Sequence, residues 1–160
     1  MNLIIGSHVS YNNKSQLLGS VKEALSYKAN TFMFYTGAPQ NTNRSVIEDS
    51  LTMEAYKLMK ENNIALEKVI VHAPYIVNLA NFNNFDFSVS FLINEVERCS
   101  TLGIKYLVLH TGSAVNCSRE EAINRVKESL INIPYNLLNK SGNKIMNELL
   151  NSDALQMNIF

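Results

Sequence analysis

Two histidines each close a short run of apolar residues. His72 follows the apolar residues 69–71, with a proline two residues further on, and His110 follows 106–109, with a glycine two residues on. An apolar run that stops at such turn residues is typical of a buried strand. In barrels of parallel strands the chemistry lies at the carboxyl ends of the strands. Because imidazole is a common zinc ligand, the two histidines could together hold metal.

A third histidine and one carboxylate complete the list of candidate ligands. His8 also follows a short apolar run, so all three histidines share one structural position. A histidine at a strand end can instead be a hydrogen-bonded polar residue with no ligand role. A catalytic zinc usually takes at least three protein ligands and a water, so a carboxylate is needed. Glu148 is the best placed, at the end of an expected fifth strand, although it could equally be a surface residue of a helix.

Two expected loops carry groups that suit contact with a nucleic acid. Tyr75 comes three residues after His72, where an aromatic ring could stack on a nucleobase or wedge beside it. A tyrosine in a loop can also simply pack on its own scaffold. Gln40 and Arg44, in the loop after the second expected strand, could contact phosphates or base edges.

The pattern of the chain alternates between strands and helices. A capping box, Ser118 with Glu121, begins the last predicted helix, which Pro134 interrupts or ends. Four βα units in succession imply an α/β fold with a parallel sheet and right-handed crossovers. We expect strands over 3–6, 31–35, 68–72 and 105–110, helices over 15–27, 51–62, 87–102 and from 118, and the start of a fifth strand near 144–146.

The length fits one domain, residues 1–160. A closed eight-stranded barrel typically needs about 250 residues, so this chain holds roughly half of one. Half a barrel leaves two open strand edges that something must cover. Three explanations stay open: the chain is a fragment, it pairs with another polypeptide, or the sheet is open. Residues 131–160 form a tail that fits the pattern poorly.

Composition argues against a general attraction to polyanions. Fourteen basic residues balance fourteen acidic ones, so any contact with DNA must come from local groups. Cys99 and Cys117 belong to no CxxC motif, which favours two free thiols in a reducing cytosol over a disulfide. The first residues do not resemble a signal peptide, and no stretch is long enough to span a bilayer. We therefore expect a cytoplasmic location and no membrane partner.

Four stretches, residues 5–10, 30–42, 71–75 and 107–113, together resemble the endonuclease IV family, the apurinic/apyrimidinic endonucleases, in its bacterial branch. The likeness covers roughly residues 1–130, the N-terminal half of such a protein. It implies a TIM barrel, of which this chain would form four βα units and a fifth strand. It also implies three zinc ions and hydrolysis, during base-excision repair, of the phosphodiester 5′ to an abasic site in double-stranded DNA, leaving a 3′-hydroxyl.

The resemblance also implies roles for particular residues. His72 and His110 match two zinc-ligand histidines, and Glu148 matches a catalytic glutamate that bridges two metals. His8 belongs to the N-terminal signature but matches no zinc ligand. Thr111 stands where the family usually has proline, and the likeness fades after residue 130. Because the later ligands of the family are missing, we expect no full zinc cluster and no activity of this chain alone, unless a second chain completes the barrel.

The DNA contacts of the family provide a test between alternatives. Gln40, Tyr75 and Ile76 match residues that enter the DNA at the lesion. A sugar isomerase of related barrel fold would also place histidines and carboxylates around a metal, but it has no use for a loop that enters DNA. A third hypothesis is a metal-free remnant that binds DNA weakly and has no activity.

Overall fold

The computed structural model describes residues 3–133 and 144–147, whose strands form one parallel sheet. Neighbouring strands follow one another in sequence order, from β1 to β5, as the alternating pattern predicted. The fold class, α/β with consecutive βα units, is therefore confirmed, and so is the fifth strand. The strands are β1 (Gly6–His8), β2 (Thr31–Phe34), β3 (Ile70–His72), β4 (Tyr106–Leu109) and β5 (Lys144–Asn147).

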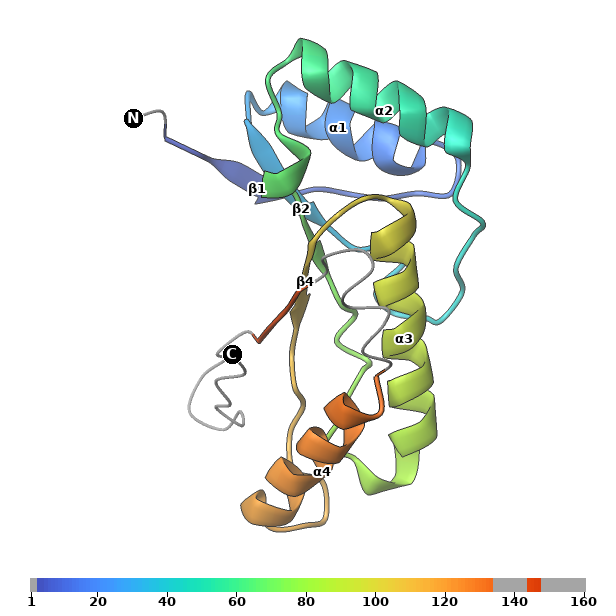
Figure 1. Ribbon diagram of the computed structural model, residues 1–160, viewed down its shortest axis with the longest axis vertical. Helices are drawn as coiled ribbons and strands as arrows, with labels where there is room; N and C mark the ends of the chain where they lie inside the picture. The colour runs from blue at the N-terminus through green and yellow to red at the C-terminus, as the bar shows by residue number, and fades with distance from the viewer. Residues whose placement is uncertain (1–2, 134–143, 148–160) are drawn as a thin grey trace.

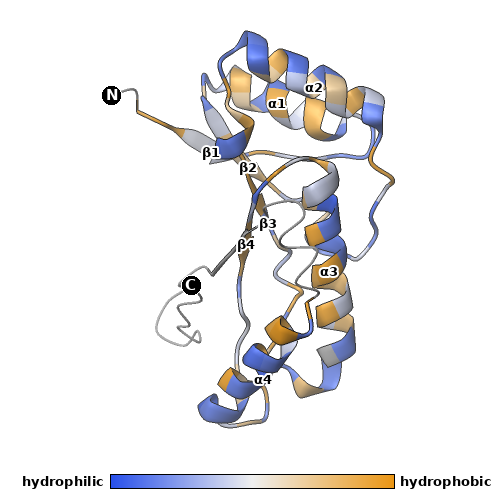
Figure 2. Ribbon diagram, in the orientation of Figure 1, coloured by the Kyte–Doolittle hydropathy of each residue, from blue (hydrophilic) through white to orange (hydrophobic). Residues whose placement is uncertain are grey.

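Helices connect the strands, and α1, α2 and α3 lie to one side of them (Figure 1). Hydrophobic and hydrophilic residues alternate along each helix, as expected for helices with one face on a core (Figure 2). None of the helices in the described residues is long and apolar enough to cross a membrane. The helices are α1 (Gln16–Ser26), α2 (Asp49–Glu61), α3 (Phe85–Thr101) and α4 (Arg119–Ile131), with 3₁₀ turns at Leu66–Lys68 and Phe82–Asn84.

The two faces of the sheet have different surroundings. Phe34 and Leu109 are fully buried in the core shared with the helices, whereas Met33 and Val108, next to them in the strands, are half-buried. Successive strand residues point to opposite faces, so this alternation separates a helix-covered face from a second face. Each fully buried Phe or Leu contributes about 1.5–3 kcal/mol of hydrophobic stabilisation, which fixes the strand register.

The first strand begins later than predicted. We expected a strand over 3–6, but it covers Gly6–His8, and Leu3 and Ile5 are 73 and 59% exposed. The partner strand starts only at Thr31, so regular pairing starts at Gly6. Before that point the side chain of Asn30 replaces a strand: its Oδ1 accepts from Ile5 N at 2.7 Å and its Nδ2 donates to Leu3 O at 2.8 Å.

The predicted capping box of α4 is confirmed. Ser118 Oγ accepts a hydrogen bond from Glu121 N at 3.2 Å, and Glu121 Oε2 accepts one from Ser118 N at 2.7 Å. Cys99 and Cys117 are free, as expected. Glu148 and Pro134 lie outside the described residues, as does most of the tail.

Candidate active site at the strand ends

Four aromatic and imidazole side chains stand at the carboxyl ends of four neighbouring strands. His8 and His72 are the last residues of β1 and β3, while Tyr35 and His110 directly follow β2 and β4. The register pairs His8 with Met33 and His72 with Val108. Tyr35 and His110 come two residues after Met33 and Val108. With side chains alternating along each strand, all four rings therefore point to the same face, the one opposite the helices.

The distances agree with this argument. The ring centres of His72 and His110 are 4.8 Å apart, and those of His8 and His72 are 6.4 Å apart. Tyr35 lies between β1 and β3, with its ring centre 4.6 Å from that of His8 and 5.2 Å from that of His72. The structure thus brings together the three histidines that the sequence placed in one structural position.

His72 is the most enclosed of the three histidines, at 4% exposure. Its Nδ1 lies 2.7 Å from the backbone oxygen of Ala73, which can only accept, so a proton is assigned to Nδ1. A metal-binding histidine usually donates one ring N–H to a carbonyl in this way, which leaves Nε2 as the ligand atom. Burial, and next to it the neighbouring His72, lower the pKa of His8 below its usual value. Both effects favour the neutral imidazole, the form that binds metal.

The donor set is suited to a metal ion but is not complete in the described part of the chain. Imidazole nitrogens suit zinc, and His72 with His110 supply two of them. Within residues 3–133 and 144–147, no three His, Cys, Asp or Glu side chains are arranged to hold a metal ion. The expected third ligand, Glu148, falls among the residues that are not described.

The loop after β3 presents Tyr75 to solvent. Tyr75 is 58% exposed and Ile76 beside it is half-buried, in a turn closed by the bond from Val77 N to Pro74 O at 3.1 Å. Asn78 ties this loop to the loop after β4, because its Nδ2 donates to Ser113 O at 3.2 Å. The predicted aromatic side chain is thus accessible, and its loop is joined to the one that begins at His110.

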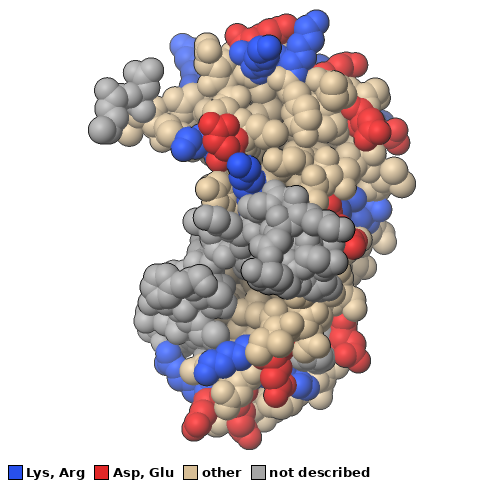
Figure 3. Space-filling view, in the orientation of Figure 1, with Lys and Arg blue, Asp and Glu red and all other residues tan. Residues whose placement is uncertain are grey.

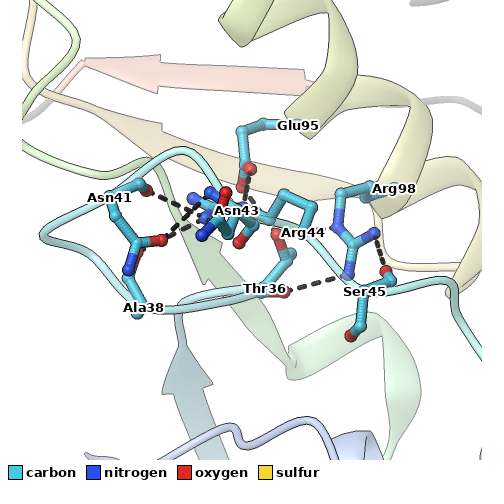
Figure 4. A network of polar contacts seen from close by, with 8 residues as sticks. All are labelled: Thr36, Ala38, Asn41, Asn43, Arg44, Ser45, Glu95 and Arg98. Atoms are coloured by element: carbon cyan, nitrogen blue, oxygen red, sulfur yellow. Dashed lines mark hydrogen bonds and ion pairs between the residues drawn. The ribbon is translucent and has the colours of Figure 1, made fainter.

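The loop after β2 contains one residue whose position differs from the expectation. Gln40 is exposed, as a residue that touches DNA must be. Arg44, which we expected at the DNA surface, instead lies inside the protein with 6% of its side chain exposed. Its Nε lies 2.6 Å from Glu95 Oε1, in an ion pair with a carboxylate on α3 (Figure 4). The buried partner explains the difference, since sequence alone did not place Glu95 beside this loop.

A pocket of about 310 Å³ lies between His8 and the loop after β2. His8 and Tyr35 form one part of its lining, and Gly37, Ala38 and Pro39 form another. On the face shown in Figure 3, basic and acidic side chains are interspersed at both ends of the molecule, and neither sign dominates. Any attraction for a phosphate must therefore be local, as the balanced composition suggested.

Sequence reasoning missed two residues of this region. Tyr35 was read only as the last residue of a strand, although its position after the apolar run at 31–34 equals that of His110 after β4. Glu95 lies in the middle of α3 and is fully buried. The apolar residues at 91–93 and 96 around it were a signal that this carboxylate faces the core.

Comparisons with known proteins give a consistent result. Residues 21–158 match the model of a family described as xylose isomerase-like TIM barrel. The chain is 53% identical over 130 residues to the probable endonuclease 4 of Acholeplasma laidlawii (strain PG-8A), covering 80% of this chain and 44% of that protein. It is 50% identical over 132 residues to the probable endonuclease 4 of Bacillus subtilis (strain 168), covering 80% and 43%.

Solved structures show the same fold. The crystal structure of endonuclease IV from Thermus thermophilus matches 94% of this chain and 55% of its own, with a TM-score of 0.71 and 24% identity. A D-psicose 3-epimerase structure matches 95% of this chain and 55% of its own, with a TM-score of 0.64 and 12% identity. At these identities the likeness concerns the fold. This chain spans less than half the length of the curated relatives named above.

Proposed function

This chain belongs to the xylose isomerase-like TIM barrel family, and from that membership we propose that it forms part of a metal-dependent endonuclease acting on abasic sites in double-stranded DNA. The proposed reaction is hydrolysis of the phosphodiester 5′ to the lesion, which leaves a 3′-hydroxyl for base-excision repair. The observation that carries the proposal is the pair of rings of His72 and His110, 4.8 Å apart at strand ends, with the exposed Tyr75 three residues after His72. Identities of about 50% to proteins named probable endonuclease 4 support it.

His72 and His110 would hold zinc, with Glu148 as the proposed carboxylate ligand and catalytic group. The contact of His72 Nδ1 with Ala73 O supports this role, because it orients the ring and sets its tautomer. Zinc, when bound, lowers the pKa of a bound water and neutralises charge on the phosphate. The resemblance implies three ions, of which these residues supply only some of the ligands.

Tyr75, Ile76 and Gln40 would enter the DNA at the lesion. Tyr75 can offer its ring to a neighbouring base because it is 58% exposed on a loop next to the histidines. Base–aromatic stacking is worth about 1–3 kcal/mol, and unstacking is least costly where a base is already missing. Ile76, next to Tyr75 in the chain, is half-buried, so part of its side chain is accessible for the same contact. A sugar isomerase has no use for such a loop.

Full activity in this proposal needs more than these 160 residues. The curated relatives are more than twice as long as their matched part, and the remainder would supply the other ligands. We therefore expect residues 1–160 in isolation not to cleave DNA, because the rest of the barrel has to be supplied for activity. A cytoplasmic location is part of the proposal, because two free thiols are typical of a reducing compartment.

Zinc content tests the ligand assignment. The purified chain is incubated with zinc, dialysed and measured by elemental analysis, in parallel with the double variant His72→Ala/His110→Ala and the control Lys105→Ala. We expect bound zinc in the wild type and in the control, and its loss in the double variant. Zinc retained by the double variant would reject these two residues as ligands, and a wild type without zinc would favour a metal-free remnant.

Binding to DNA tests the substrate. Fluorescence anisotropy compares a duplex carrying one tetrahydrofuran abasic analogue with the same duplex without it. We expect tighter binding to the abasic duplex, and a loss of about fivefold to 100-fold of that preference in Tyr75→Ala, the range that one stacking contact gives. Tyr27→Ala is the matched control, since Tyr27 is 59% exposed at the far end of α1. Equal affinity of the wild type for both duplexes contradicts the proposal, and zinc-dependent cleavage by the isolated chain contradicts its expected inactivity.

A further inference from the structure

Two buried guanidinium groups hold the backbone of the loop after β2, residues 36–45. The Nη1 of Arg44 donates to three backbone carbonyls, and Arg98 on α3 donates to two more (Figure 4). Five peptide groups of one loop are thereby fixed by two side chains. The accepting carbonyls belong to Ala38 at 3.3 Å, Asn41 at 3.1 Å and Asn43 at 3.0 Å for Arg44, and to Ser45 at 2.7 Å and Thr36 at 2.9 Å for Arg98.

Glu95 joins the two guanidinium groups into one network. Its Oε1 accepts from Arg44 Nε at 2.6 Å, and its Oε2 accepts from Thr36 Oγ1 at 2.7 Å. Thr36 Oγ1 in turn accepts from Arg98 Nε at 3.1 Å. Glu95 and Arg98 are three residues apart in a helix, so they share one face of α3. The carboxylate therefore connects the beginning of the loop, at Thr36, with its end, at Arg44.

Burying this charged network costs free energy, so stabilising the core does not by itself explain it. Glu95 is fully buried, Arg98 is 8% exposed and the Arg44 side chain is 6% exposed. Replacing a buried ion pair with apolar residues often leaves stability unchanged or raises it, because the charges lose their hydration. A buried polar network does, however, restrict its surroundings to one conformation through the bonds that it makes, and in this one the buried atoms Arg44 Nη2 and Ser45 Oγ make none. What this network restricts is the path of the loop.

The restricted loop is the one that borders the candidate site. Gly37, Ala38 and Pro39 line the pocket that His8 and Tyr35 also line, and Gln40 is exposed directly after them. Gly37 fits closely against Arg44, because a Cβ there would lie 2.9 Å from Arg44 Cδ and Nη1. Arg44 Nη1 also donates to Ala38 O and Asn41 O, on either side of Gln40, so the path of the backbone at Gln40 depends on the Arg44 side chain.

We propose that Glu95, Arg44 and Arg98 are positioning residues that set the loop after β2 for recognition of the abasic site through Gln40. The inference rests on the proposed function and deepens it, since it assigns a role to three residues that do not touch DNA. Arg44 acts by a fixed fork of donors, which a lysine cannot reproduce although it keeps the charge.

The test measures whether the network acts through Gln40. Arg44→Lys is compared with the wild type for its preference for abasic over intact duplex and for hydrogen exchange of the backbone amides of residues 37, 38 and 40–43. We expect the preference to fall about tenfold, the effect of losing 1–2 charge-assisted hydrogen bonds, and exchange in the loop to rise about fivefold or more. In a Gln40→Ala background, the same Arg44→Lys change should alter the preference by less than about twofold.

Two controls separate this role from simple stability. The first control is Arg125→Lys in α4. Arg125 also pairs with a glutamate and lies over a phenylalanine ring, but it should change neither the preference nor the exchange when replaced by lysine. If Arg44→Lys does not fold, Thr36→Val removes the hydroxyl between Glu95 and Arg98, and Thr36→Ser, which keeps it, should restore the preference.

The outcomes are distinct. A wild type without preference for the abasic duplex contradicts the proposed function itself, before any variant is measured. Given that preference, the inference is wrong if Arg44→Lys leaves the preference and the exchange unchanged, or if its full effect persists in the Gln40→Ala background.

Discussion

Two arginine–glutamate pairs share an ion pair and a contact of the arginine with a phenylalanine ring, but they lie in very different surroundings. Arg44 Nε lies 2.6 Å from Glu95, and Arg125 Nη1 lies 3.0 Å from Glu128. Each guanidinium group also lies over a phenylalanine ring. Arg44 Cζ is 4.8 Å from the ring centre of Phe91, and Arg125 Cζ is 4.6 Å from that of Phe82. The exposed fractions of the side chains are 6% and 0% for the first pair, and 22% and 60% for the second.

The two pairs differ in whether they depend on the tertiary structure. Arg125 and Glu128 are neighbours on one helix, so α4 brings them together whatever the rest of the chain does. Arg44 and Glu95 are 51 residues apart and meet only when α3 packs beside the loop after β2. An exposed pair is worth little because water competes for both charges. Breaking a buried pair leaves an unpaired charge inside the protein.

The largest expected effect comes from Glu95→Ala. It leaves the buried guanidinium group of Arg44 without its carboxylate and Thr36 Oγ1 without its acceptor. We therefore expect the free energy of unfolding to fall by about 3–5 kcal/mol in urea denaturation. Glu128→Ala, the matched change in the exposed pair, should cost less than about 1 kcal/mol. Similar losses in the two variants would mean that the two pairs are equivalent and would contradict the comparison.

The next effect comes from Gly37→Ala, which tests how closely the loop fits Arg44. A Cβ at this position would lie 2.9 Å from atoms of a side chain that is buried and bonded, and so has little room to move. We expect a loss of about 1–3 kcal/mol, the usual range for overpacking. In the double variant with Arg44→Ala the total loss should be smaller than the sum of the two single losses, and strict additivity would contradict the close fit.

A smaller effect is expected at the start of α4, where structure depends on local contacts. Ser118→Ala removes the side chain that accepts from Glu121 N, and should cost about 1 kcal/mol of stability. Thermal unfolding followed by circular dichroism measures the loss. Ser113→Ala, which changes an exposed serine outside the helix, is the control and should leave stability unchanged.

The smallest expected effect is a loss of stability at low pH, through the carboxylate of Glu121. Hydrogen bonds from the side chain and backbone of Ser118 lower the pKa of Glu121 below its usual value of 4.5 in the folded protein. Because the folded pKa is the lower one, this contribution to stability is complete above the unfolded pKa and is lost as the pH falls through the folded pKa. An NMR titration should show the pKa of Glu121 return towards 4.5 in Ser118→Ala. An unchanged pKa in that variant would show that the capping box is not its cause.

Sequence patterns predicted the strands, the helices and the end of the sheet at which the histidines meet. These features depend on short-range rules, namely alternation along a strand and 3.6 residues per helical turn. The start of β1 was misplaced because Leu3 and Ile5 are apolar, yet no partner strand among the described residues extends far enough to pair with them. The role of Glu148 stays a prediction, since it lies outside the described residues.

By itself, then, the sequence determined the order of the elements, the capping box at Ser118 and Glu121, and the convergence of His8, His72 and His110. Each of these follows from residues close together in the chain combined with the parallel arrangement of strands. Only the tertiary structure decided that Arg44 turns inward to Glu95 rather than outward to solvent. The physical reason is that an arginine in a polar loop faces water unless a buried acceptor lies within reach, and whether one does depends on how α3 packs, 51 residues away.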